Sequence, residues 1–185
     1  DIIFNGFVTA NTLVTQNPAY DLTFNAGGAI ATNTDILSTG ILTIGNDADD
    51  VMTFAGGFSS GSTGGMNLAG TLATTDTALD INRVTVLTAN STISAGSGAI
   101  TIAGTVDGNF DLNLNTTTGV VSIDSVIGGG TAINTLTTNA GGSTSINANI
   151  TTTSDQTYLN TVDIEGATRT LTSNGGAIFF DGTVD

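Results

Sequence analysis

The densest group of side chains that could do chemistry is an acidic cluster in the first third of the chain. Asp47, Asp49 and Asp50 fall within one short stretch between the apolar residues Ile44 and Val51. Hard oxygen ligands placed this close together suit Ca²⁺. The stretch lacks the glycine and the terminal glutamate of an EF-hand loop, and it also lacks the Gly-Gly-x-Gly-x-Asp pattern of calcium-binding β-rolls. Two interpretations remain open here, a calcium site and an acidic solvated loop.

Most catalytic chemistry is excluded by residue type. The chain has no cysteine and no histidine, so the common nucleophile–base pairs and most transition-metal sites cannot form. A carboxylate pair of the glycosidase kind is conceivable with sixteen acidic residues. None of these acids clusters in sequence with Arg83 or Arg169, the only basic residues. We therefore expect no catalytic residues, no enzyme activity and no cofactor other than Ca²⁺.

Charge and hydropathy restrict the partners. The formal net charge is −14, which disfavours binding to nucleic acid and to anionic membrane surfaces. No stretch approaches the roughly 18 consecutive apolar residues of a membrane span, so no membrane insertion is expected.

Composition favours strands and sharp corners. The sequence contains 36 Thr, 18 Asn and 25 Gly, with one Pro and no Lys. Threonine is β-branched and suits strands, whereas glycine and asparagine suit turns. Short alternating pieces such as Ile100–Ile102, Ile178–Phe180 and 110–114 follow or precede Gly-rich steps. This alternation predicts half-buried strands, with Phe24, Phe110 and Phe180 pointing inward.

A long internal repeat is present. Residues 84–107 match residues 162–185 at an offset of 78 without a gap, and both stretches end in Gly-Thr-Val-Asp. The second copy covers 107–185, and a loosely matched first copy covers about 28–106.

The repeat predicts a solenoid. If one copy holds four coils, each coil has about 19–20 residues and the chain makes roughly nine coils. A loop insertion is expected at 55–65, where Gly and Ser crowd without alternation. Thr-x-Thr pairs, as at Thr135 and Thr137, are unevenly spaced and indicate ordinary outward strand residues rather than a regular ice-binding face.

The C-terminal half resembles a family of large bacterial exoproteins. The residues that carry the resemblance are 111–115, 126–158 and 171–185, with phrases such as Asn-Ala-Gly-Gly and Gly-Gly-Ala-Ile-Phe-Phe-Asp-Gly-Thr-Val-Asp. They are similar to the β-strand repeats of filamentous-haemagglutinin-like and autotransporter-like proteins. The resemblance implies a right-handed parallel β-helix, a cell-surface or matrix role and no catalytic residues.

These observations lead to a structural hypothesis. We expect an extracellular β-solenoid that serves as a shaft or filament segment, because its ends would present unpaired strand edges to other copies. The alternative is an adhesin module that recognises a glycan or a host protein through the 55–65 loop.

Overall fold

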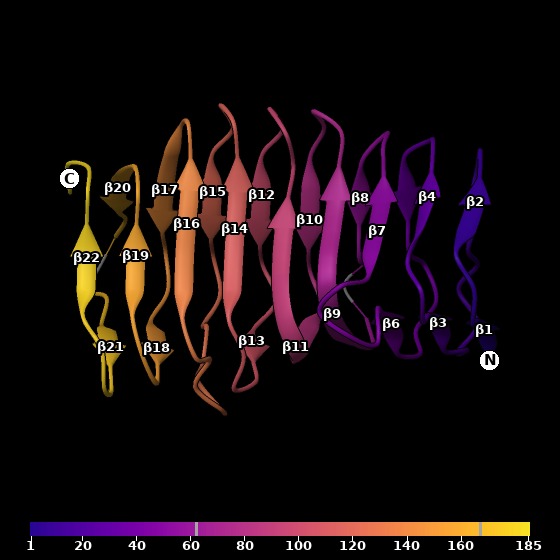
Figure 1. Cartoon of the computed structure of the whole chain (residues 1–185), viewed down its shortest axis with the longest axis horizontal. Coiled ribbons are helices and arrows are strands. Elements are labelled where there is room, and N and C mark those ends of the chain that lie inside the picture. Colours follow the sequence, from indigo (N-terminus) through magenta and orange to yellow (C-terminus); the bar gives the residue numbers. More distant parts are fainter. Residues whose placement is uncertain (62, 167) are drawn as a thin grey trace.

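The chain forms a parallel β-solenoid with three strand-bearing faces. The computed structural model describes residues 1–61, 63–166 and 168–185, which contain β-strands and no helix. All paired strands are parallel, and each pairs with strands about one coil away in sequence. Figure 1 shows the coils stacked along one axis, with the two termini at opposite ends. The predicted parallel β-helix is therefore confirmed.

We name the faces A, B and C. Face A lies in front in Figure 1, face B behind it, and face C along the bottom. Strands β9 (Gly65–Thr74) and β11 (Val84–Ser94) bend from face C into face A. The remaining strands of face A are β2 (Val8–Ala10), β4 (Gly28–Ile30), β7 (Val51–Phe54), β14 (Leu112–Thr116), β16 (Leu136–Ala140), β19 (Gln156–Tyr158) and β22 (Ile178–Phe180).

The other two faces carry shorter strands. Face B holds β5 (Thr34–Asp35), β8 (Phe58–Ser59), β10 (Leu79–Ile81), β12 (Ile100–Ile102), β15 (Val121–Ile123), β17 (Ser143–Ile146) and β20 (Thr161–Ile164). Face C holds β1 (Ile2–Phe4), β3 (Leu22–Phe24), β6 (Leu42–Ile44), β13 (Val106–Asp107), β18 (Ile150–Thr152) and β21 (Leu171–Ser173).

Strand register defines the coil length, which varies along the chain. The equivalent positions Asn5 and Asn25 are 20 residues apart, whereas Thr43 and Asn67 are 24 residues apart. The solenoid makes about eight turns. The prediction of roughly nine coils was slightly high, because insertions at some corners lengthen the average coil.

The 78-residue offset does not match a whole number of coils. Ile100 lies in β12 on face B, whereas its match Ile178 lies in β22 on face A. Val106 lies in β13 on face C, whereas its match Val184 bridges β20 on face B. The register therefore shows that one copy of the repeat does not hold four whole coils. Each copy is displaced by one face, so the unit that recurs in the structure is a strand with its corner.

Loops longer than the ordinary corner occur between faces C and A. The chain turns tightly from Leu22 to Gly28, but the equivalent connection from Leu42 to Met52 in the next coil is longer. The added residues form the loop that carries the acidic cluster. A second long connection runs over residues 128–135.

The expected insertion at 55–65 coincides with regular structure in the residues that are described. Strand β8 lies within it. The corner from Phe58 to Met66 has the same length as the corner from Thr34 to Leu42 one coil earlier, and it is two residues longer than the corner from Leu79 to Thr85 one coil later. Ser62 lies outside the described residues.

Inward side chains form one continuous core. Successive inward positions on face C are Leu22, Leu42 and Met66, each at most 1% exposed. Aromatic rings pack along this core as stacked or tilted pairs. The pairs are Phe4–Phe24 at 5.2 Å, Phe54–Phe58 at 4.6 Å and Tyr158–Phe180 at 5.0 Å between ring centroids. Phe24 points inward as predicted, but Phe110 is 37% exposed because it precedes the strand, in the corner before β14.

Corner glycines allow coils to approach closely. Gly27 has a φ of +67°, and a Cβ there would lie 2.0 Å from the carbonyl oxygen of Val51 in the next coil. A side chain at this corner would force the two coils apart.

A stability comparison tests the inward and outward assignments. Leu114 is fully buried and Asn113 beside it faces outward. Leu114→Ala should lower the free energy of unfolding by about 2–5 kcal/mol, through lost burial and a residual cavity. Asn113→Ala should change it by less than about 0.5 kcal/mol. Urea unfolding followed by circular dichroism measures both, and equal effects would contradict the assignment.

The core of the C-terminal coils also contains polar side chains that bond to one another. The Tyr158 hydroxyl donates to Gln156 Oε1 at 2.9 Å, and Gln156 Nε2 donates to the carbonyl of Thr172 at 2.8 Å. Burial raises the pKa of Tyr158 well above its ordinary value.

This buried hydroxyl predicts a loss of stability in alkali. In the unfolded chain Tyr158 ionises near pH 10, whereas the folded chain holds its proton to higher pH. Above about pH 10 the unfolded state therefore binds fewer protons, and the free energy of unfolding falls as pH rises. Urea titrations between pH 8 and pH 11 measure the slope. Tyr158→Phe should flatten it, and an unchanged slope in this variant would count against the assignment.

Candidate functional site

The acidic loop projects from the corner between faces C and A. Its carboxylates bond to the loop itself: Asp50 Oδ2 accepts from the amides of Asn46 at 2.8 Å and Asp47 at 3.2 Å, and Asp47 Oδ1 accepts from the amide of Asp49 at 2.9 Å. These bonds hold a tight turn and explain why short acidic side chains occupy it.

The structure does not group the three carboxylates as ligands around one point. Within the described residues, no set of three or more acidic side chains is placed to hold a metal ion. Calcium binding by Asp47, Asp49 and Asp50 stays a prediction from the sequence.

Arg83 is buried at the corner after face B. Its side chain is 1% exposed, and burial lowers the pKa of the guanidinium below its usual range. Its hydrogen bonds go to backbone carbonyls of earlier parts of the chain. Nη1 donates to Gly40 at 2.7 Å and to Gly65 at 3.4 Å, Nε donates to Ser60, and Nη2 donates to Ser38.

These bonds tie three successive coils together at one corner. Corner carbonyls lie outside the regular ladder of the strands, so they need another donor when they are buried. Arg83 supplies a planar fork of donors that satisfies several of them at once. The guanidinium is therefore a structural clamp and is not displayed to a ligand.

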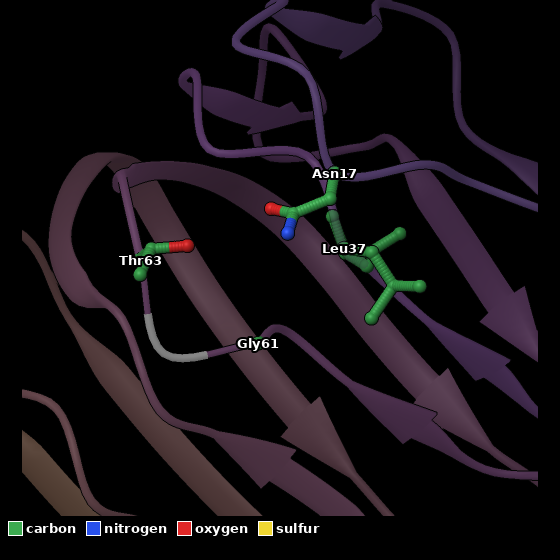
Figure 2. A pocket seen from close by; sticks show the side chains of 5 residues that line it. Asn17, Leu37, Gly61 and Thr63 are labelled. Carbon is green, nitrogen blue, oxygen red and sulfur yellow. The ribbon is translucent and has the colours of Figure 1, made fainter.

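A shallow hollow lies near this corner. It has a volume of about 320 Å³ and is lined by Asn17, Ile36, Leu37, Gly61 and Thr63. Figure 2 shows Asn17 and Leu37 on one side and the segment of Gly61 and Thr63 on the other. None of these lining residues is titratable, so the hollow offers no acid, base or nucleophile.

Face A carries two straight rows of outward side chains, which we call the front ranks. Register places each member beside the next, coil after coil, at the strand spacing of about 4.8 Å. One of the two rows extends further, to Val51 at one end and to Phe179 at the other, and these two residues are not counted as members of the front ranks. The first front rank is Thr71, Thr92, Asn113, Thr137 and Thr157, and the second is Ala73, Ser94, Asn115 and Asn139.

The front ranks contain no charged residue, although the chain is strongly acidic. The outward row of face B, by contrast, includes Asp35, Asp80 and Asp163. The outward row of face C includes Asp107. The strands of face A thus present uncharged outward side chains, and carboxylates lie close by at Asp111 and Asp155, which immediately precede β14 and β19 at the edge of the face.

The two ends of the stack present strand edges. At one end β1 and β2 pair only with the following coil, and at the other β21 and β22 pair only with the preceding one. Inward positions are exposed there, with Ile2 at 45% and Val184 at 46%. No long apolar helix of the membrane-crossing kind occurs in the described part of the chain.

Comparisons with known protein families, curated proteins and solved structures find no match to this chain. The fold and the surfaces above are therefore the basis for a functional argument.

Two of these features were missed in the sequence. Arg83 gave no signal beyond being a rare cation, because its partners are backbone carbonyls 18 to 45 residues away. The front ranks were missed because the Thr-x-Thr pairs were compared by the number of residues between them in the sequence, which is uneven. Their alignment appears only once the register of each coil, including its insertions, is known.

The clamp predicts a large effect of a single substitution. Arg83→Met keeps an unbranched chain but leaves buried carbonyls of Ser38, Gly40 and Ser60 without their donor. We expect the free energy of unfolding to fall by about 3–5 kcal/mol. Arg83→Lys keeps the charge with fewer directed donors and should fall between wild type and Arg83→Met. Chemical denaturation measures this order, and a Met variant as stable as wild type would refute the clamp.

Proposed function

We propose that this chain is a structural segment of an extracellular bacterial surface or matrix protein, a rigid β-solenoid shaft that stacks end to end with other copies. The observation that carries the proposal is the uninterrupted parallel pairing from the first coil to the last around one continuous core. Such a stack has few ways to bend, because successive coils are bonded to each other along more than one face.

The ends support the stacking. Within this segment, the first and last coils each leave a parallel strand edge open and an inward apolar residue partly exposed, Ile2 in the first and Val184 in the last. Two copies joined head to tail would make a heterologous contact that does not close on itself, and such contacts extend into filaments. Added strands would contribute backbone hydrogen bonds at the junction.

The proposed role is not enzymatic. It is supported by the residue inventory, which has neither histidine nor cysteine, and by the use of Arg83 as a clamp. The resemblance of the C-terminal half to bacterial exoproteins supports the extracellular location, and the net charge of −14 supports partners other than nucleic acid.

Electron microscopy of the purified chain over a concentration series tests the stacking. Wild type should form thin rods that lengthen with concentration. Ile2→Lys combined with Val184→Lys places charges in the two end surfaces and should leave single short particles. Ile3→Lys is the matched control, because Ile3 is also exposed but belongs to the outward row of face C. Single particles of wild type at every concentration would refute the end-to-end proposal.

A further inference from the structure

We propose that the front ranks of face A form a binding surface for an uncharged polysaccharide chain. This inference goes beyond the structural role above and does not depend on it, because it concerns the side of the solenoid rather than its ends.

The charge distribution of the surface favours an uncharged partner. All sixteen acidic residues of the chain lie outside the front ranks, which contain only Thr, Asn, Ser and Ala. The outward rows of the other two faces do carry carboxylates, at Asp35, Asp80 and Asp163 on face B and at Asp107 on face C. A neutral face on a protein with a net charge of −14 suits a neutral partner, which approaches without the cost of desolvating a charge.

The polar groups of the front ranks are free to bind a ligand. No side chain of the front ranks donates or accepts a hydrogen bond within the described part of the chain, whereas Ser122 and Asn147, near face B, bond to Asp124. Asn115 and Asn139 each offer an amide with both donors and acceptors. These groups are held by short side chains on rigid strands, so little conformational freedom is lost on binding.

A hollow lies beside the second front rank. It has a volume of about 170 Å³ and lies where face A turns toward face B. It is lined by Ser, Thr, Asn and Gly residues, which include three successive members of the second front rank. The lining residues are Ser94, Gly96, Asn115, Thr116, Thr117 and Asn139.

Repetition favours a polymer over a single small molecule. The ranks repeat about every 4.8 Å between coils and about every 6.6 Å along a strand. A polysaccharide repeats hydroxyl groups along a line in a comparable way, so one chain could contact several coils. Weak contacts at each coil then combine through multivalency.

Other partners fit the surface less well. An anionic polymer lacks a cation to meet on face A, since Arg83 is buried and Arg169 lies between β20 and β21, at the corner from face B to face C. A protein interface usually has several aromatic or apolar anchors at its centre, whereas the nearest aromatic residue in these rows is Phe179, beyond the end of the first rank. An ice surface would need an even plane, whereas the ranks mix side chains of different length and border a hollow.

Affinity gel electrophoresis tests the proposal with three uncharged polymers, dextran, laminarin and galactomannan, and with anionic alginate. The acidic chain migrates readily, and binding appears as retardation that grows with polymer concentration. We expect retardation by at least one uncharged polymer and none by alginate. Asn115→Ala combined with Asn139→Ala should weaken binding roughly tenfold, through the loss of several hydrogen bonds.

Thr101→Ala combined with Thr151→Ala is the control, because these threonines face outward on faces B and C. This variant should bind as wild type does. The proposal is overturned if none of the three uncharged polymers retards the chain. It is also overturned if the face A variant, Asn115→Ala with Asn139→Ala, binds as tightly as wild type. Two other outcomes would assign the face differently, if no glycan binds. Inhibition of ice recrystallisation that is lost in the face A variant would assign the face to ice. Side-by-side dimers in size-exclusion chromatography that are lost in this variant would assign it to a second copy of the chain. The binding test is also run on the short particles of the end variant, Ile2→Lys with Val184→Lys. Retardation of these particles would show glycan binding without filament formation.

Discussion

The pairing of each coil with the next is the interaction on which the whole structure depends. A single coil has three short strands and cannot bury its inward side chains alone, so its stability comes from the coils above and below. This dependence explains the composition. Corners must be narrow enough for backbones to approach, which places Gly27 against Val51, and outward residues must stack on their own kind, as Asn25 does on Asn5 at 2.8 Å. Backbone pairing between successive coils supplies the cross-links that disulfides would otherwise provide.

Local chemistry made the strands predictable, whereas the register was not. Alternation at Ile100–Ile102 and Ile178–Phe180 identified real strands, because inward and outward positions differ in polarity along any half-buried strand. The 78-residue match did not indicate which face each strand belongs to. A strand and its corner need the same kinds of residue on each of the three faces, so matching sequences can lie on different faces. Phe110 was assigned inward for a related reason: the alternation continued past the point where the strand begins at Leu112.

The functional surfaces depend on long-range register and were therefore harder to predict. The acidic loop was visible at once, because Asp47, Asp49 and Asp50 are neighbours in sequence. Its role in the structure, a turn closed by carboxylate-to-amide bonds, uses the same residues as the calcium hypothesis. Arg83 and the front ranks are assembled from separate coils. A loop of a few residues in one coil, such as the one before Val51, changes which later residues align, so sequence spacing alone cannot reveal them.

The geometry separates two kinds of demand on the sequence. Inward residues and corners hold the coils together and tolerate little change, because close packing and backbone contact set their size. Outward residues contribute little to stability, so face A could carry acids like its neighbours without loss of the fold. Excess negative charge on stacked outward rows is unfavourable at a separation of about 4.8 Å. That cost applies equally to faces B and C, where Asp35, Asp80 and Asp107 nevertheless occur. Folding alone therefore does not account for the uncharged outward rows of face A, and the polysaccharide contact proposed above would account for them.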